Sequence, residues 1–168
     1  MSSDLSIYID PGKFAGSGER LSGLVNLADL PRLTDLIGQQ AGDVRYGLAF
    51  AINDKGLIII TGEIKSELTL VCQRCLREMT VPVHSLVNIG IVVDEKELEI
   101  IDEDLDPFLA VDGKVSILKL IEDELLLCLP IAPMHDEADC PAAESLQEYK
   151  AVKQNPFAAL ETLKRGKT

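Results

Sequence analysis

Hydrophobic and polar residues alternate along residues 45–93 in the pattern of strands that bury one face. The alternation is interrupted at residues 53–56, an Asn-Asp-Lys-Gly sequence with turn chemistry, and again at residues 76–79. We therefore expect three strands connected as an antiparallel meander, with Cys72 and Cys75 at the bend between the second and third strands. The residues predicted to share one face are Tyr46, Leu48 and Phe50 in the first strand and Val81, Val83, Ser85, Val87, Ile89 and Ile91 in the third.

The spacing of apolar residues changes to that of a helix over residues 117–129. Ser116 is a suitable N-cap, and Pro130 ends the helix. Four residues form one apolar stripe and three more widen it: Ile117, Ile121, Leu125 and Cys128, then Leu118, Leu126 and Leu129. The acids at 122–124 occupy the surface that remains. So broad an apolar surface predicts a helix packed across the sheet as the centre of the core, with Cys128 as a buried small hydrophobic residue.

The N-terminal part of the chain is less clearly patterned. Within residues 1–24, an edge strand is expected at residues 8–9. Asp29 is predicted to cap a short helix that has Pro31 in its first turn and Leu33, Leu36 and Ile37 on one face. Together these elements predict a single α+β domain over residues 1–134, an antiparallel β-sheet meander packed by a central helix.

Residues 135–168 differ in composition from the domain before them. They are mostly polar, and near their end Asn155 caps a short helix that begins at Pro156 and finishes in basic residues. The apolar face of this helix consists only of Phe157, Leu160 and Leu163. Such a face either docks weakly on the domain or folds against a partner as a recognition segment. We therefore expect a flexible C-terminal arm with a short basic helix.

The chain has 168 residues and a net charge of −12. A protein this acidic repels nucleic acid at long range unless it carries a local basic surface. Eight acids are concentrated in residues 94–106, whereas Lys164 and Arg165 belong to a basic tail. Either both segments are simply solvated, or the acidic one attracts a basic protein, such as a ribosomal protein, while the tail contacts RNA.

The sequence favours a cytoplasmic protein with no membrane partner. Its longest apolar runs, at 57–60 and 125–129, are too short to span a bilayer. Its first residues lack the basic and apolar regions of a secretory signal. Four unevenly spaced cysteines do not resemble a disulfide framework, which is consistent with a reducing compartment.

Most of the cysteine and histidine residues fall into two motifs. Cys72-Gln73-Arg74-Cys75 presents two thiols from one bend, and His135 with Cys140 adds an imidazole and a third thiol. These four residues are a complete tetrahedral set for one structural zinc. Two other interpretations remain open: no metal, or a redox dithiol, although the strand-to-helix context usual for redox motifs is missing. His84 is expected to be a partly exposed sheet residue rather than a ligand.

Four segments, in this order, resemble the bacterial YceD family, also known as large ribosomal RNA subunit accumulation proteins: Glu67–Cys75, Ile121–Pro130, Pro133–His135 with Cys140, and Asn155–Arg165. The resemblance runs from about residue 45 to the end of the chain. Many relatives carry several cysteines where this chain has His135 and Cys140, and the exchange preserves the number of candidate zinc ligands. The resemblance implies a cytosolic protein needed for synthesis, processing or stability of large-subunit (23S) ribosomal RNA. It implies neither an established enzymatic activity nor a small-molecule substrate.

Three functions remain open. The leading one is a non-catalytic ribosome biogenesis factor that contacts assembly intermediates through ribosomal protein, ribosomal RNA or both. The second is an acidic adaptor that binds a basic ribosomal protein without RNA contact. The third is an RNA-processing enzyme, for which the acids at 94–106 lack convergent His or Lys residues. The residues expected to bind a partner are Gln73, Arg74, Asn155, Pro156, Phe157, Lys164 and Arg165.

Overall fold

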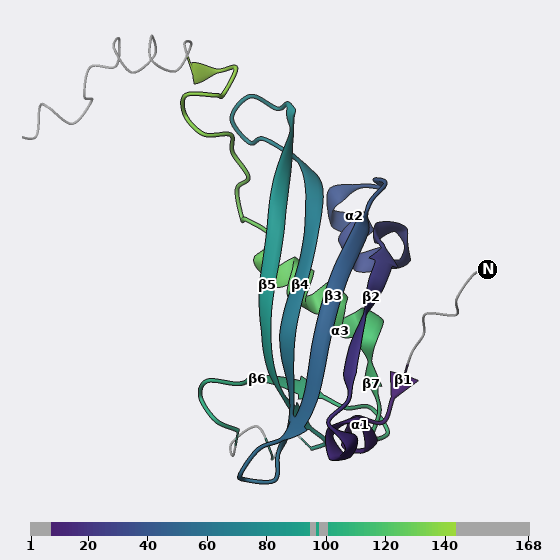
Figure 1. Cartoon of the computed structure of the whole chain (residues 1–168). Coiled ribbons are helices and arrows are strands. Elements are labelled where there is room, and N and C mark those ends of the chain that lie inside the picture. Colours follow the sequence, from purple (N-terminus) through teal and green to yellow (C-terminus); the bar gives the residue numbers. More distant parts are fainter. Residues whose placement is uncertain (1–7, 95–96, 98–100, 144–168) are drawn as a thin grey trace, which may run out of the picture. The chain divides into compact units, whose positions relative to one another are not determined.

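The computed structural model describes residues 8–94, 97 and 101–143 (Figure 1). The chain divides into two compact units, one of residues 1–70 with 80–131 and one of residues 71–79 with 132–168. Within the described residues, three α-helices accompany a mostly antiparallel sheet, so the predicted α+β fold is confirmed. The predicted boundary at residue 134 stays a prediction.

A five-stranded sheet contains β2 (Arg20–Asn26), β3 (Asp43–Ile52), β4 (Ile58–Val71), β5 (Glu78–Val92) and β6 (Asp106–Leu109), in that order (Figure 1). The β2–β3 and β3–β4 pairs are antiparallel, whereas β6 is parallel to β5. The predicted meander corresponds to β3, β4 and β5, and the structure adds β2 and β6 at its two sides. The predicted turn at residues 76–79 is wrong in its second half. The turn closes earlier, because the backbone N–H of Cys72 donates to the carbonyl of Arg77, and β5 has begun by Glu78.

The face of the meander that the alternation selects is the buried one. Tyr46, Leu48 and Phe50 are buried, as are Val83, Ser85, Val87, Ile89 and Ile91, while Val81 is half-buried. The predicted turn after β3 is confirmed, since the side-chain oxygen of Asn53 accepts hydrogen bonds from the backbone of Lys55 and Leu57. A one-residue change of register would expose this whole apolar row, which is why the sheet has one stable pairing.

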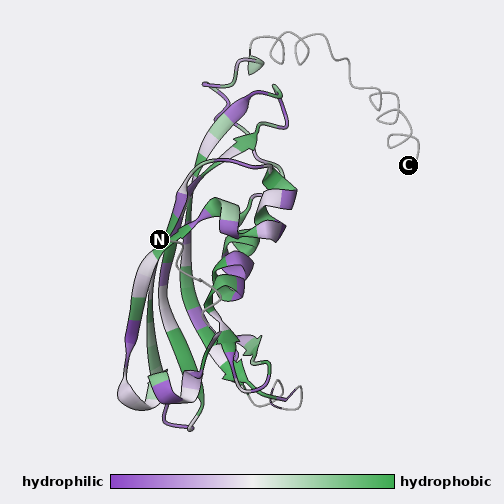
Figure 2. Ribbon diagram, turned by 90° about the vertical axis from the view of Figure 1, so that its right-hand side faces the viewer, coloured by the Kyte–Doolittle hydropathy of each residue, from purple (hydrophilic) through white to green (hydrophobic). Residues whose placement is uncertain are grey.

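Helix α3 (Ile117–Cys128) lies against one face of the sheet (Figure 2). Ser116 caps it as predicted, and its hydroxyl accepts a hydrogen bond from the backbone N–H of Lys119. Cys128, however, is exposed, so the prediction that it is buried is wrong. It is the last residue of the helix, and burial requires a neighbouring layer as well as a place on the apolar stripe. Leu120, which the stripe omitted, is completely buried.

The prediction that the acids at 122–124 occupy the surface left outside the apolar stripe is wrong for two of them, because Glu122 is 6% exposed and Glu124 is 9% exposed. At 100° per residue, Glu124 falls within the apolar stripe, and its carboxylate accepts a hydrogen bond from the hydroxyl of Ser85 on β5. One carboxylate oxygen of Glu122 accepts the backbone N–H groups of Arg32 (2.7 Å) and Leu33 (3.2 Å). These bonds satisfy the two buried carboxylates, which would otherwise destabilise the core.

The N–H groups of Arg32 and Leu33 belong to the first turn of α2 (Pro31–Ile37). Because Glu122 accepts them, the predicted cap by Asp29 is wrong. Asp29 belongs instead to the short 3-10 helix η1 (Leu27–Asp29), which Asn26 caps, and α2 has no cap from its own flanking side chain. On α2, Leu33 is buried but Leu36 is 65% exposed. The start of α2 is thus capped by a residue of α3, distant in sequence.

The first described residues form two elements. Strand β1 (Tyr8–Ile9) is confirmed and pairs with β7 (Val115–Ser116) in a separate two-stranded sheet. Helix α1 (Pro11–Ser17), which was not predicted, is capped by Asp10, and its Phe14 ring meets Phe50 edge to face. The pKa of Asp10 is lowered chiefly because its carboxylate accepts the backbone N–H of Lys13.

We predict that Glu122→Ala lowers the free energy of unfolding by about 1–3 kcal/mol, because it leaves the buried N–H of Leu33 and the part-buried N–H of Arg32 without an acceptor. Glu122→Gln keeps an amide oxygen there and is expected to cost less. Asp123→Ala is the matched control, since Asp123 pairs with the exposed Arg32 side chain, and loss of such a pair costs at most about 1 kcal/mol. Urea denaturation of the three variants measures the difference. Equal losses for Glu122→Ala and Asp123→Ala would contradict the capping role.

Candidate metal centre

The first part of the candidate site is the tight turn between Val71 and Glu78. The backbone N–H of Leu76 donates to the carbonyl of Cys72 (2.9 Å), and Leu76 adopts a left-handed conformation with φ of 59°. This conformation disfavours a bulky residue and reverses the chain immediately after Cys75. The backbone N–H of Arg77 thereby reaches the sulfur of Cys75.

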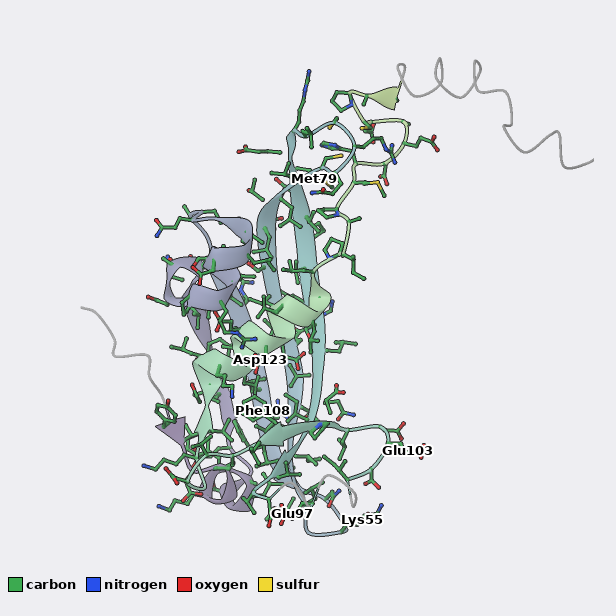
Figure 3. The ribbon with its side chains drawn as sticks, turned by 180° about the vertical axis from the view of Figure 1, so that it is seen from behind. Lys55, Met79, Glu97, Glu103, Phe108 and Asp123 are labelled. Carbon is green, nitrogen blue, oxygen red and sulfur yellow. The ribbon has the colours of Figure 1, made fainter. Side chains whose placement is uncertain are left out.

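The second part is the segment of residues 132–143, which belongs to the same unit as the turn. The carbonyl of Pro133 accepts the backbone N–H of Gln73 (2.8 Å), and the backbone N–H of His135 points at the sulfur of Cys72 (3.5 Å). A further turn follows, in which the N–H of Asp139 donates to the carbonyl of Asp136 (3.1 Å). These bonds fix His135 and Cys140 beside the Cys-x-x-Cys turn, and sulfur atoms gather in this unit (yellow in Figure 3).

The four predicted ligand residues come together. One donor atom from each of Cys72, Cys75, His135 and Cys140 lies within 4.8 Å of all the others, and the Cys75 sulfur is 3.4 Å from Nδ1 of His135. Donor atoms around a tetrahedral metal with bonds of about 2.3 Å are about 3.8 Å apart. Cys72 and Cys140 are buried, and the other two are half-buried. The cluster could therefore hold a metal ion.

Backbone N–H groups prepare one of these cysteines for ionisation. Burial opposes the charge on Cys72, but N–H groups of Cys75, His135 and Arg74 directed at its sulfur lower its pKa to about 5. Burial raises the pKa of Cys75, and the neighbouring Cys72 and Cys140 act in the same direction. Ionisation of all three thiols would place like charges side by side, and a bound cation would offset that repulsion.

The predicted partner-binding residues have different environments. Gln73 is exposed, and its side-chain amide donates to the carbonyl of Val71. Arg74 is partly buried: Nη2 lies 3.8 Å from the sulfur of Met134, while Nη1 is buried without a hydrogen-bond partner. Asn155, Pro156, Phe157, Lys164 and Arg165 lie outside the described residues.

Sequence reasoning missed the backbone contribution to the site. Residue types do not reveal the N–H groups that point at the sulfurs or the left-handed conformation of Leu76. The Cys-x-x-Cys spacing, however, is itself typical of such turns.

The expectation for His84 is confirmed, since it is part-exposed on β5 and lies 3.2 Å from the carboxylate of Glu63. Among the described residues, no helix is long and apolar enough to cross a membrane.

Comparison with known proteins identifies the family of the chain. Residues 60–164 match the family described as "Large ribosomal RNA subunit accumulation protein YceD", a span that includes all four donor residues. The protein of that name from Haemophilus influenzae is 27% identical, over 96% of this chain and 97% of the relative. No solved structure matches the chain. Because the family match covers more than half of its residues, the chain belongs to the YceD family.

Proposed function

We propose that this protein is a non-catalytic ribosome biogenesis factor that acts in the cytosol to support accumulation of large-subunit (23S) ribosomal RNA. The observation that carries the proposal is the family match across residues 60–164. The relative from Haemophilus influenzae corresponds to this chain over nearly the full length of both proteins, so the likeness extends beyond one shared module. The name of that relative refers to the RNA of the large ribosomal subunit.

The cluster of Cys72, Cys75, His135 and Cys140 is proposed to bind one structural zinc ion. Three sulfurs and one imidazole are the donors of many tetrahedral zinc sites, and a set of four protein ligands leaves no open position for a substrate. The redox alternative receives less support, because His135 and Cys140 lie as close to the two thiols as a four-ligand site requires. The same closed donor set argues against an RNA-processing enzyme that uses this metal.

The role proposed for the zinc is to hold a partner-binding surface in shape. The surface includes Gln73 and Arg74 in the turn, and the arm of residues 135–168 with Asn155, Pro156, Phe157, Lys164 and Arg165. Gln73 is exposed and Arg74 is partly exposed, so a partner can reach both side chains of this turn.

Charge favours protein contact as the second candidate. The net charge of −12 opposes approach to RNA, and Glu103, Asp104 and Asp106 are exposed. An adaptor that binds a basic ribosomal protein without touching RNA would use this acidic surface. The two candidates therefore differ in the partner that is contacted directly, and they share the biological process.

We predict about one equivalent of zinc in protein purified without chelators, because the four donors complete one tetrahedral site. Cys72→Ser is expected to lose the metal. Cys128→Ser removes an exposed thiol outside the cluster and should keep it, which makes it the matched control. Elemental analysis by mass spectrometry measures the content. Wild-type protein without metal, or equal loss in both variants, would refute the four-ligand site.

The biological role is tested in a bacterium whose own family member has been deleted. We expect the wild-type chain and Cys128→Ser to restore the ratio of 23S to 16S ribosomal RNA, and Cys72→Ser to fail because its partner-binding surface is no longer held. Quantitative electrophoresis of total RNA gives the ratio. Failure of the wild-type chain would count against the function itself, whereas full restoration by Cys72→Ser would count only against the need for the metal.

The direct partner is tested by binding to 23S ribosomal RNA and to purified basic ribosomal proteins at several salt concentrations. If RNA is contacted, deletion of residues 164–168 and Arg74→Glu should each weaken RNA binding and reduce its salt dependence, since each removes positive charge. Arg45→Glu, an equal charge change on β3, serves as the control. No RNA affinity, together with binding of a basic ribosomal protein, would favour the adaptor.

A further inference from the structure

Strand β2 is one edge of the five-stranded sheet (right-hand side in Figure 1), and Figure 2 views the molecule from that side. Its ladder with β3 runs without interruption through all seven residues, from the Arg20–Ala49 pair to the Asn26–Asp43 pair. Natural sheets usually protect an edge with lysine, proline, a bulge or a covering segment. The sequence of β2, Arg-Leu-Ser-Gly-Leu-Val-Asn, has no lysine, proline or acid.

The hydrogen bonds that flank the ladder show which backbone groups face outward. The N–H of Phe50 donates to the carbonyl of Glu19, and the N–H of Leu27 donates to the carbonyl of Gly42, so odd-numbered residues of β2 bond to β3. The N–H and carbonyl groups of Arg20, Ser22 and Leu24 therefore point away from the sheet, whereas the carbonyl of Asn26 opens the 3-10 helix η1. Their side chains are exposed, and Leu24 is 56% exposed.

The strand is complementary to a second copy of itself. Antiparallel pairing about a two-fold axis at Gly23 sets Ser22 opposite Leu24 of the second copy and Arg20 opposite Asn26 of the second copy. No like charges face each other in this register. The outward N–H and carbonyl groups of Ser22 and Leu24 fall opposite those of Leu24 and Ser22 of the second copy as hydrogen-bonded pairs. At Gly23 a Cβ would lie 3.0 Å from the Tyr46 hydroxyl, so a side chain there would require Tyr46 to shift by a few tenths of an ångström.

Charge allows this pairing although each chain carries a net charge of −12. The exposed acids at 103–106 lead into β6, which is the opposite edge of the sheet. Strands are spaced by about 4.8 Å, so the two acidic edges of such a dimer would be about 40 Å apart. This separation is several times the Debye length of about 8 Å at physiological salt, so the repulsion is screened.

We propose that β2 pairs antiparallel with β2 of a second copy of this chain, which joins two five-stranded sheets into one continuous sheet. The pairing satisfies the free backbone groups of both edges and covers both Leu24 side chains. It involves neither the metal cluster nor the proposed partner-binding surface.

The test is the mass of the full chain in solution as a function of concentration, measured by sedimentation velocity and by size exclusion with light scattering. Wild-type protein is expected to be a dimer. The double variant Ser22→Lys with Leu24→Lys places lysine opposite lysine at two symmetric positions and should raise the dimer dissociation constant about tenfold or more. Ser22→Glu with Leu24→Lys places opposite charges there and should restore the dimer.

Both double variants alter only exposed side chains of β2, and circular dichroism with thermal unfolding checks that each is folded. A wild-type protein that is monomeric at all concentrations overturns the proposal. A dimer that survives the lysine pair forms elsewhere on the molecule, which also overturns it. Failure of the Glu/Lys variant to recover the dimer rejects the register about Gly23.

Discussion

The burial of α3 against one face of the sheet is the interaction on which the rest of the larger unit depends. It buries the leucine and isoleucine side chains of the helix, and it also brings three consecutive acids, residues 122–124, to different neighbours. Glu122 caps α2, Asp123 pairs with the side chain of Arg32, and Glu124 accepts from Ser85. Hydrophobic burial is not directional, whereas these hydrogen bonds select one rotation of the helix. The polar bonds thus specify an arrangement that the apolar contacts stabilise.

The smaller unit presents the opposite situation. Its described residues, 71–79 and 132–143, contribute only Cys72 and Cys140 to the buried apolar residues. Segments this short cannot bury enough apolar surface to offset the loss of chain entropy, and proteins of this size commonly use a metal or disulfides instead. The N–H groups directed at Cys72 and Cys75 suit sulfurs that carry negative charge. A metal bound by both segments would link residues about sixty positions apart. Such a link closes a long loop and therefore lowers the conformational entropy of the unfolded chain by a large amount.

The distribution of charge separates the surfaces of the larger unit. The exposed acids near β6 lie at one edge of the sheet, and the acid-free strand β2 lies at the other. The net charge of −12 is a sum over the whole chain, and it therefore describes neither edge. Long-range repulsion of nucleic acid and short-range pairing of strands can coexist in one small domain because salt screens charges separated by more than a Debye length.

Local patterns in the sequence determined the three central strands, the α3 helix with its Ser116 cap, and the identity of the four clustered candidate ligand residues. Each of these follows from a short-range rule: alternation, capping preference, or the spacing of soft donors. Tertiary structure decided the burial of Glu124, the exposure of Cys128 and the capping of α2 by Glu122. It also decided the parallel pairing of β6 with β5 and the N–H groups that surround the cysteine sulfurs. None of these could be predicted, because whether a side chain is buried or a backbone group is paired depends on residues far away in the chain.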